Sequence, residues 1–270
     1  MTGLIDNFKE ALVYPTKDYK ALLILGVIFI FTGLSSIATA WQIELNATTL
    51  SIFGLISFIV SFIIQGYILS VMRESINLND EIPALDIANN FVDGIKYLVV
   101  EIVYYIIPAI LVLIVGWLSG TFSAVFNIVE YVGEDVANTT VNATTLVNSI
   151  PEDYWAALFS GLVITAIFAM IVFIIFGLLL QIAMCRLAKY DSIGEALNIK
   201  EVIGDIKEIG IGKYIAWYIL ILIIIMVLAI IMGIISAIPY IGVILGLLVF
   251  APFIALFVSR SIATLYSEAQ

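Results

Sequence analysis

Three polar side chains interrupt hydrophobic stretches of the sequence and are the first candidates for chemistry. Glu101 lies shortly after Lys96 at the start of a long apolar run, and Gln65 and Gln181 lie inside two other runs. A carboxylate within a bilayer is costly and usually faces the protein interior or water, so Glu101 could mark a solute or ion path. The alternative is that Glu101 lies at headgroup depth and pairs with Lys96 or a neighbouring helix. The two glutamines could line the same path, or form hydrogen bonds between helices.

The residue types that most catalytic sites need are scarce in this chain. It has no histidine and one cysteine, Cys185. This excludes Ser-His-Asp and Cys-His arrangements, histidine-based zinc and haem sites and an intrachain disulfide, whereas carboxylate sites for magnesium or calcium stay chemically open. The longest stretch outside the hydrophobic runs, residues 119–154, is too short for a soluble catalytic domain. We therefore predict that the protein is not an enzyme and has no catalytic residues, no cofactor and no metal site.

Six hydrophobic runs must position these residues. They cover residues 21–40, 50–72, 97–118, 155–183, 214–237 and 241–262. Each reaches the roughly 20 residues that a helix needs to cross the hydrocarbon layer, and none alternates as a barrel strand would. Apolar residues make up 63% of the chain and the mean hydropathy is +1.17. We predict an all-α, polytopic membrane bundle of six transmembrane helices, forming one integral membrane domain over residues 1–270 with an outer loop at 119–154.

The basic residues predict the orientation of this bundle. All 11 Lys and Arg residues fall in segments that can share one side of a membrane, and the other three connections have none. Because basic loops resist translocation, both termini are expected in the cytoplasm of a multi-pass protein of the cell membrane. Arg260, at the end of the last run, is expected to extend to the cytoplasmic surface. Possible glycosylation sites, as Asn-x-Thr sequons in the connections without basic residues, are Asn46, Asn138 and Asn142.

The connections on the basic side resemble one another. Residues 80–93 and 191–205 come into register with one inserted residue, which aligns Asp93 with Asp205, and residues 7–10 resemble residues 90–93. The residues that carry this repeated motif are Pro83, Asp86, Phe91, Asp93, Gly94, Lys96 and Asp205. We predict three parallel repeats, at 1–72, 80–183 and 191–262, each an interfacial amphipathic helix followed by a transmembrane hairpin.

Helical periodicity assigns an apolar face to each of the three interfacial helices. The faces comprise Leu4, Ile5, Phe8, Ala11 and Leu12 in the first, Leu85, Ala88, Phe91, Val92 and Ile95 in the second, and Ala196, Ile199, Ile203 and Ile206 in the third. We expect these faces to lie on the membrane, with the polar residues between them directed away from it.

The segment from Pro83 to Lys96 resembles the recurrent segment of an uncharacterised family of archaeal and bacterial membrane proteins, domain of unknown function 4013. The layout is also similar to the membrane domain of some glycerophosphodiester phosphodiesterases, although the catalytic domain of those proteins is not found in these 270 residues. The resemblance implies six helices and, with the sequons and the acidic composition, an archaeal-like envelope. It implies no catalytic residue.

Together these features predict a non-enzymatic scaffold or accessory component of the cell envelope. Its expected partners are the lipid bilayer and another membrane protein or a second copy of the chain. With a net charge of −10 and no basic cluster, no nucleic-acid partner is expected. The alternative is a transporter or channel for a small or lipidic solute. It requires a cavity that reaches the middle of the membrane and touches Glu101, Gln65 and Gln181.

Overall fold

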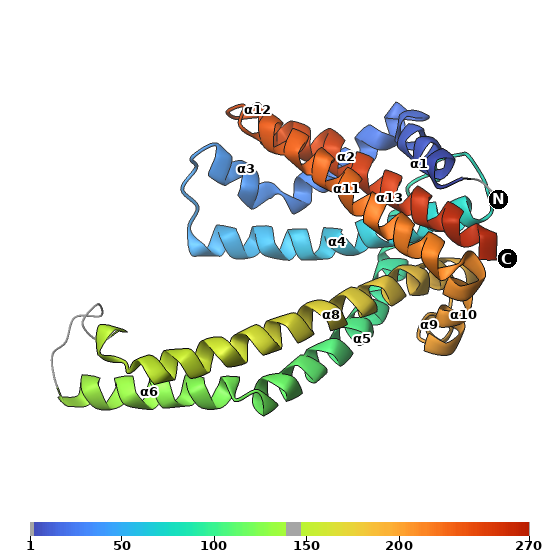
Figure 1. The fold of residues 1–270 in the computed structure, drawn as a ribbon. Helices are drawn as coiled ribbons and strands as arrows, with labels where there is room; N and C mark the ends of the chain where they lie inside the picture. The colour runs from blue at the N-terminus through green and yellow to red at the C-terminus, as the bar shows by residue number, and fades with distance from the viewer. Residues whose placement is uncertain (1–2, 139–146, 270) are drawn as a thin grey trace. The chain divides into compact units, whose positions relative to one another are not determined.

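The structure, a computed structural model, describes residues 3–138 and 147–269, except for the side chains of residues 134–138. These residues form helices joined by short connections, and none of them forms a β-strand (Figure 1). The predicted all-α class is therefore confirmed for the described part of the chain. The chain divides into two compact units: unit 1 comprises Met1–Glu101 and Leu179–Gln270, and unit 2 comprises Ile102–Leu178.

Five helical segments are long and apolar enough to cross a membrane. They are α4 (Ala47–Ile76), α5 (Ile87–Leu118), α8 (Glu152–Tyr190), α11 (Ile211–Ser236) and the segment Ile241–Ala269, which consists of α12 (Ile241–Leu245), the π-helical turn η2 (Gly246–Phe250), α13 (Ala251–Tyr266) and η3 (Ser267–Ala269). A sixth span results if α2 (Tyr19–Thr32) and α3 (Leu34–Ala40) are counted together. The structure therefore supports five or six spans.

The first predicted run is bent rather than straight. Its two helices, α2 and α3, meet at Gly33 with an angle of 75°. A Cβ atom at Gly33 would lie 2.2 Å from Leu247 Cδ1, and one at Gly26 would lie 1.9 Å from the carbonyl oxygen of Leu248. Both glycines thus allow the first run to pack closely against η2. The bend depends on this contact with a segment more than 200 positions away, so the hydrophobic run alone could not predict it.

Only two of the three predicted interfacial helices are separate helices. They are α1 (Leu4–Val13) and α10 (Ile199–Ile209), the latter preceded by the short α9 (Ile193–Ala196). The predicted second one, around residues 85–95, is instead the first part of α5 and continues into the span without a break. The physical difference is Gly210, which ends α10 with a φ of 97°, in the left-handed region that glycine favours. No described residue between Ile87 and Leu118 has a positive φ.

The predicted faces of these helices need correction. Asn90 and Asp93, as polar residues, were expected to point away from the membrane, yet both are buried. Val92 and Ile95 are 53% and 43% exposed, as residues that face lipid would be. In α1 the buried residues include Asn7 beside Phe8 and Ala11. The inward faces carry polar residues because those residues have hydrogen-bond and ion-pair partners in the neighbouring helices. A hydropathy pattern treats every polar residue as outward and cannot detect such partners.

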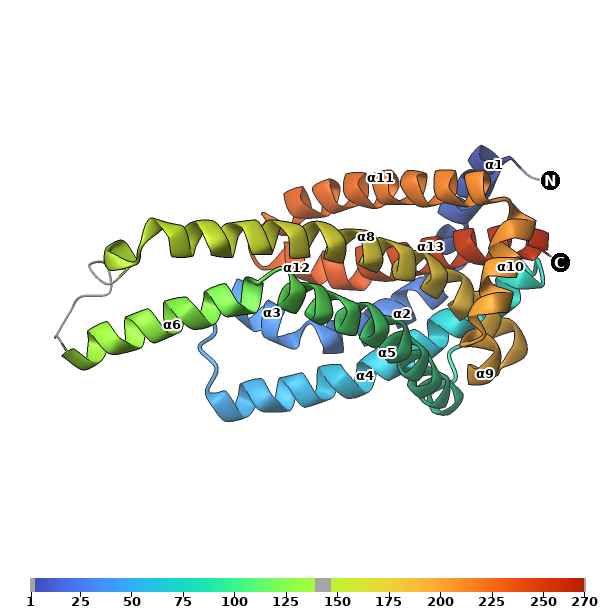
Figure 2. The same ribbon diagram turned by 60° about the horizontal axis from the view of Figure 1, so that its bottom comes forward.

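The core of unit 1 joins helices that are far apart in the sequence. Its central buried cluster comprises Tyr14, Leu22, Leu25, Tyr67, Val71 and Leu256. These residues come from the 3₁₀ turn η1 (Tyr14–Thr16), from α2, from α4 and from α13. The N-terminal helix α1 packs beside α13, at the end of the unit where η3 closes the chain (Figure 1, Figure 2). We call this end of unit 1 the terminal end.

Unit 2 contains the second half of α5, the first part of α8 and a further helix between them, α6 (Thr121–Asn138). The predicted outer loop therefore begins with a helix of 18 residues. Gly120, with a φ of 77°, makes the turn from α5 to α6. Beside it, the hydroxyls of Ser119, Thr121 and Thr165 lie 2.8 to 3.1 Å from one another and fix α6 against α8 within this unit.

Candidate functional site

The terminal end of unit 1 contains three clusters of ion pairs and hydrogen bonds, each arranged around one arginine. Arg73 lies near the end of α4, Arg186 near the end of α8 and Arg260 within α13. The side chains of Arg186 and Arg260 are only 5% and 2% exposed. A buried guanidinium must be paired with acceptors to avoid a large desolvation cost. Each of the three contacts a backbone carbonyl and two carboxylates.

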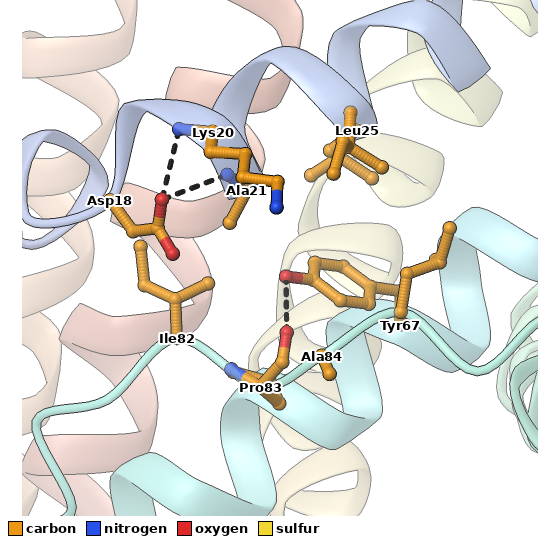
Figure 3. Close-up of a pocket in the computed structure, with 10 residues that line it drawn as sticks. Asp18, Lys20, Ala21, Leu25, Tyr67, Ile82, Pro83 and Ala84 are labelled. Carbon is orange, nitrogen blue, oxygen red and sulfur yellow. Dashed lines mark hydrogen bonds between the residues drawn. The ribbon is translucent and has the colours of Figure 1, made fainter.

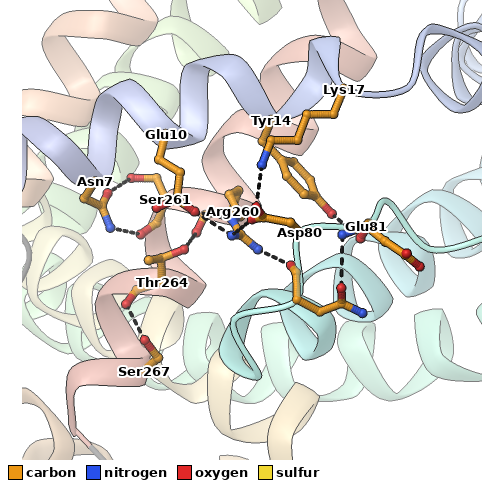
Figure 4. Close-up of polar contacts among 11 residues, drawn as sticks. Asn7, Glu10, Tyr14, Lys17, Asp80, Glu81, Arg260, Ser261, Thr264 and Ser267 are labelled. Atoms are coloured by element: carbon orange, nitrogen blue, oxygen red, sulfur yellow. Dashed lines mark hydrogen bonds and ion pairs between the residues drawn. The ribbon is translucent and has the colours of Figure 1, made fainter.

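The Arg260 cluster ties α13 to α1 and to the connection after α4 (Figure 4). Arg260 Nη2 lies 2.5 Å from Glu10 Oε1 and 2.7 Å from Asp80 Oδ1. Its Nη1 donates to the Asn79 carbonyl at 2.5 Å. The guanidinium also lies over the Tyr14 ring, with Cζ 4.9 Å from the ring centroid. One side chain thus holds three segments together.

Two groups in this cluster have shifted pKa values. A hydrogen bond from Lys17, whose Nζ lies 3.0 Å from Asp80 Oδ2, together with the charges of Lys17 and Arg260, lowers the pKa of Asp80. Stabilisation from these contacts is therefore present at neutral pH and is lost as the pH falls through the pKa of Asp80. Burial raises the pKa of Tyr14 to about 12, so its hydroxyl stays protonated and donates to the Glu81 carbonyl at 3.1 Å.

A buried hydrogen-bond chain lies next to Arg260. The Asn7 amide donates to the Ser261 carbonyl at 3.2 Å and accepts from the Ser261 hydroxyl at 2.8 Å. Trp217 Nε1 donates to the same hydroxyl at 2.8 Å. This chain connects α1, α13 and α11, and it explains why Asn7 points inward.

The Arg73 cluster joins α4, α5 and the connection after α8. Arg73 Nε donates to the Ala188 carbonyl at 3.0 Å, and Nη2 lies 3.2 Å from Asp93 and 3.6 Å from Asp191. Lys96 Nζ bridges the same two carboxylates at 2.9 and 2.7 Å. Two cations and two anions therefore compensate each other beside a pocket of about 390 Å³.

The Arg186 cluster joins α8 to α9 and α10. Its Nη1 lies 2.8 Å from Asp205 Oδ2, its Nη2 lies 2.6 Å from Glu195 Oε2, and its Nε donates to the Glu195 carbonyl at 3.0 Å. The Tyr266 hydroxyl donates to the same Asp205 oxygen at 3.0 Å. Asp205 thus receives two donors in a largely buried position.

Each arginine pairs with at least one carboxylate that the sequence comparison placed in register. Asp93 and Asp205 were aligned directly, and Glu10 corresponds to Asp93 through the resemblance of residues 7–10 to 90–93. The arginines themselves were not recognised as partners. Arg260 was expected to extend to the surface, and this was wrong because its partners lie inside the cluster. A repeated spacing could have identified two of the pairs, since 20 residues separate Arg73 from Asp93 and 19 separate Arg186 from Asp205.

The predicted intramembrane polar residues lie elsewhere. Glu101, Gln65 and Gln181 are all half-buried. Lys96 forms its ion pairs with Asp93 and Asp191 rather than with Glu101. Gln65 Oε1 is buried and has no hydrogen-bond partner among the described residues. Four pockets of about 330 to 500 Å³ lie around the terminal end, and these three side chains line none of the four.

The remaining motif residues build the joint between α4 and α5. Asp86 caps α5 by accepting from the Asn89 backbone amide at 3.2 Å, and the Pro83 carbonyl accepts from the Tyr67 hydroxyl at 2.9 Å. The Phe91 ring packs edge-on against Phe62, with 5.5 Å between the centroids. A Cβ atom at Gly94 would lie 1.9 Å from the Phe62 carbonyl oxygen. These positions therefore have structural roles in close helix packing.

The sequons can be placed only in part. Asn46 is the N-cap of α4, where its side-chain oxygen accepts from the Thr49 backbone amide at 2.8 Å. Asn142 and the side chain of Asn138 lie outside the described residues. Glycosylation at the three sites stays a prediction.

The long apolar helices define this chain as a polytopic α-helical membrane protein. It belongs to a family described as protein of unknown function (DUF4013), whose sequence profile matches residues 49–237. The match includes Arg73 and Arg186 with the carboxylates that they bind, whereas Arg260 and α1 lie outside it. No curated protein and no solved structure matches the chain. The resemblance to the phosphodiesterase membrane domain stays a prediction.

Proposed function

We propose that this chain is a non-enzymatic scaffold or accessory component of the cell envelope. The observation that carries the proposal is the use of three arginines, of which Arg186 and Arg260 are buried and Arg73 is half-buried. Arg73, Arg186 and Arg260 all bind carboxylates and carbonyls of the same chain, and in doing so they join helices to one another. Side chains with the greatest potential for electrostatic catalysis or ligand binding are thereby engaged in holding the fold together.

The apolar surface of the spans supports the same proposal. In the most hydrophobic part of each of the five spans, between 0% and 28% of the residues are buried inside the structure. Lipid and neighbouring membrane proteins are the partners that such surfaces accept. We propose that the chain associates with a second copy of itself or with another membrane protein through these helices.

We further propose that three related segments close into a ring, with both termini in the cytoplasm. The support is the pairing order. Arg73 near the end of α4 pairs with Asp93 of α5, and Arg186 near the end of α8 pairs with Asp205 of α10. Arg260 of α13 pairs with Glu10 of α1. In this proposal α1 supplies the carboxylate that pairs with the arginine of the last transmembrane hairpin. In the same way, α10 supplies the carboxylate for the preceding hairpin.

Cross-linking in a mild detergent tests the scaffold role. After purification and treatment with a short amine-reactive cross-linker, we expect an oligomer or a stable complex with another membrane protein. The control is the same sample denatured in dodecyl sulfate before cross-linking. A monomer without any partner that conducts solutes in liposomes would overturn the proposal.

Thiol labelling tests the orientation. The background is Cys185→Ala, which removes the only cysteine, and single cysteines replace Thr48, Asn89 and Lys200, all of which are exposed. A membrane-impermeant maleimide added to intact cells should label position 48 and leave positions 89 and 200 unlabelled until the membrane is opened. Labelling of position 89 or 200 in sealed cells would contradict the assignment of the termini to the cytoplasm.

The alternative proposal, a transporter or channel, is favoured by Gln65. Its buried Oε1 lacks a partner among the described residues, and such an acceptor is costly unless water or a solute binds it. If it lines a path, Gln65→Leu should abolish solute flux in liposomes. If it has no such role, Gln65→Leu should leave flux equal to that of the unmodified protein and raise thermal stability slightly, because an unsatisfied polar group is removed. Gln181→Leu on α8 tests the second glutamine and should reduce flux only if it lines the same path.

A further inference from the structure

We propose that a pocket between α2, α4 and the connection after α4 binds a zwitterionic phospholipid, with its acyl chain in the pocket and its phosphate at Lys20. The pocket has a volume of about 430 Å³. This lies within the roughly 300 to 1,000 Å³ of typical small-molecule sites. The proposal concerns ligand binding and holds whether the protein acts as a scaffold or a transporter.

The pocket wall matches an acyl chain. Leu25 of α2 lies on one side and Ile82 of the connection on the other (Figure 3). Ile24 and Leu85 also line the pocket. An acyl chain that enters this pocket would exchange lipid neighbours for protein side chains of the same polarity. Apolar contact therefore positions the acyl chain, while the preference for one lipid over another depends on the headgroup.

Hydrogen bonds to the backbone of the connection after α4 hold this wall of the pocket in place. The Tyr67 hydroxyl donates to the Pro83 carbonyl at 2.9 Å, and the Tyr14 hydroxyl donates to the Glu81 carbonyl at 3.1 Å. Arg260 holds the start of the same connection through Asn79 and Asp80. Because the connection is fixed at both positions, a ligand would not have to order it, and the entropic cost of binding is reduced.

The mouth of the pocket carries one cation and one anion. Lys20 is exposed, and its ammonium forms no ion pair with a described residue, in contrast to Lys17, which pairs with Asp80. One oxygen of Asp18 accepts from the backbone amides of Lys20 and Ala21 at 2.9 and 3.0 Å. These bonds fix the carboxylate at the mouth, where Figure 3 shows it beside Ile82. A phosphate would meet the ammonium and an amine would meet the carboxylate, which is the charge pattern of a zwitterionic headgroup.

Lys20 lies at the depth in the membrane where a lipid headgroup is expected. Lys20 lies at the start of α2, and α2 with α3 is apolar enough to form a bent span. Basic side chains at the ends of spans lie at the level of the phosphates. The acyl chain would then continue along α2 into the hydrocarbon layer.

Native mass spectrometry of the full chain in mild detergent tests the proposal. After delipidation, phosphatidylethanolamine, phosphatidylglycerol and diacylglycerol with identical acyl chains are added separately. We expect one phosphatidylethanolamine to be retained more strongly than either of the other lipids. Lys20→Gln should weaken its binding about fivefold, from the loss of one cation at the headgroup. Ala84→Trp, which fills the pocket from an exposed position, should abolish binding.

The control variant is Lys9→Gln, which removes another exposed lysine that forms no ion pair with a described residue. It should bind as the unmodified protein does, and all variants should unfold at the same temperature. Equal retention of phosphatidylglycerol or diacylglycerol would overturn the headgroup assignment. Competition by phosphoethanolamine without acyl chains, or an equal loss in Lys9→Gln, would overturn the pocket assignment.

Discussion

Replacing Arg186 with methionine is expected to lower the free energy of unfolding by about 3 kcal/mol, the usual cost of removing one partner from a buried ion pair. The side chain of Asp205 is only 14% exposed. Without the guanidinium, this carboxylate keeps a single described donor, the Tyr266 hydroxyl. The cost arises mainly from the uncompensated charge, so removing that charge as well should restore stability.

A double-mutant cycle separates this explanation from a loss of packing. The double variant Arg186→Met/Asp205→Leu should be more stable than Arg186→Met alone, by about 1 kcal/mol or more. Lys200→Met, at an exposed position of α10, is the control and should change stability by less than about 0.5 kcal/mol. If the double variant is less stable than either single variant, charge compensation is not the role of this pair.

The chain contains its own reporter for these measurements. Cys185 is the only cysteine and is buried. A maleimide dye that fluoresces after reacting with a thiol will therefore report unfolding of the protein in detergent. For Arg186→Met we expect a decrease of about 6 to 12 °C in the unfolding temperature, given the usual relation for chains of this size. Fluorescence well below the transition shows whether Cys185 remains buried in each variant.

Replacing Gly66 with leucine is expected to have an effect at least as large. A Cβ atom there would lie 1.7 Å from the carbonyl oxygen of Asn90, and one at Gly94 would lie 1.9 Å from that of Phe62. The backbones of α4 and α5 thus approach each other directly at two places. Since neither contact can be relieved by rotating a side chain, α4 and α5 would have to separate, at a cost of about 3 kcal/mol or more.

Gly54 supplies a matched control on the same helix. It lies in α4 and has no heavy atom within 4 Å of a Cβ built on it. Gly54→Leu should therefore leave the unfolding temperature unchanged or raise it slightly, since leucine favours helix over glycine. The dye assay with Cys185 compares the two variants. Equal stability of Gly54→Leu and Gly66→Leu would show that the close approach of α4 and α5 is not needed for the fold.

The sequence predicted the long elements well, because an uninterrupted apolar run of about 20 residues has few other solutions. It did not predict the bend at Gly33, which depends on packing against Leu247. It also placed Asn90 and Asp93 on the wrong side, since their partners Ser70 and Arg73 lie on another helix. Periodicity describes one helix at a time and cannot show which polar residues find partners.

The candidate site could also be predicted only in part. The motif residues from Pro83 to Lys96 and the alignment of Asp93 with Asp205 did identify the carboxylates of two clusters. Glu101, Gln65 and Gln181 were predicted as candidates because they interrupt apolar runs, yet the ion pairs of the arginines lie near the ends of the helices. Arg260 and Glu10 are separated by 250 positions, so no local pattern could connect them.

The pairing of α1 with α13 sets an order of events during synthesis. Asn7 and Glu10 leave the ribosome early, but their partners Ser261 and Arg260 follow about 250 residues later. At roughly 5 to 20 residues per second, the interval is on the order of tens of seconds. During this time α1 lacks its partners in α13, and we expect its apolar residues to lie on the bilayer surface. Helix α1 is thus made long before the residues of α13 that hold it in the fold.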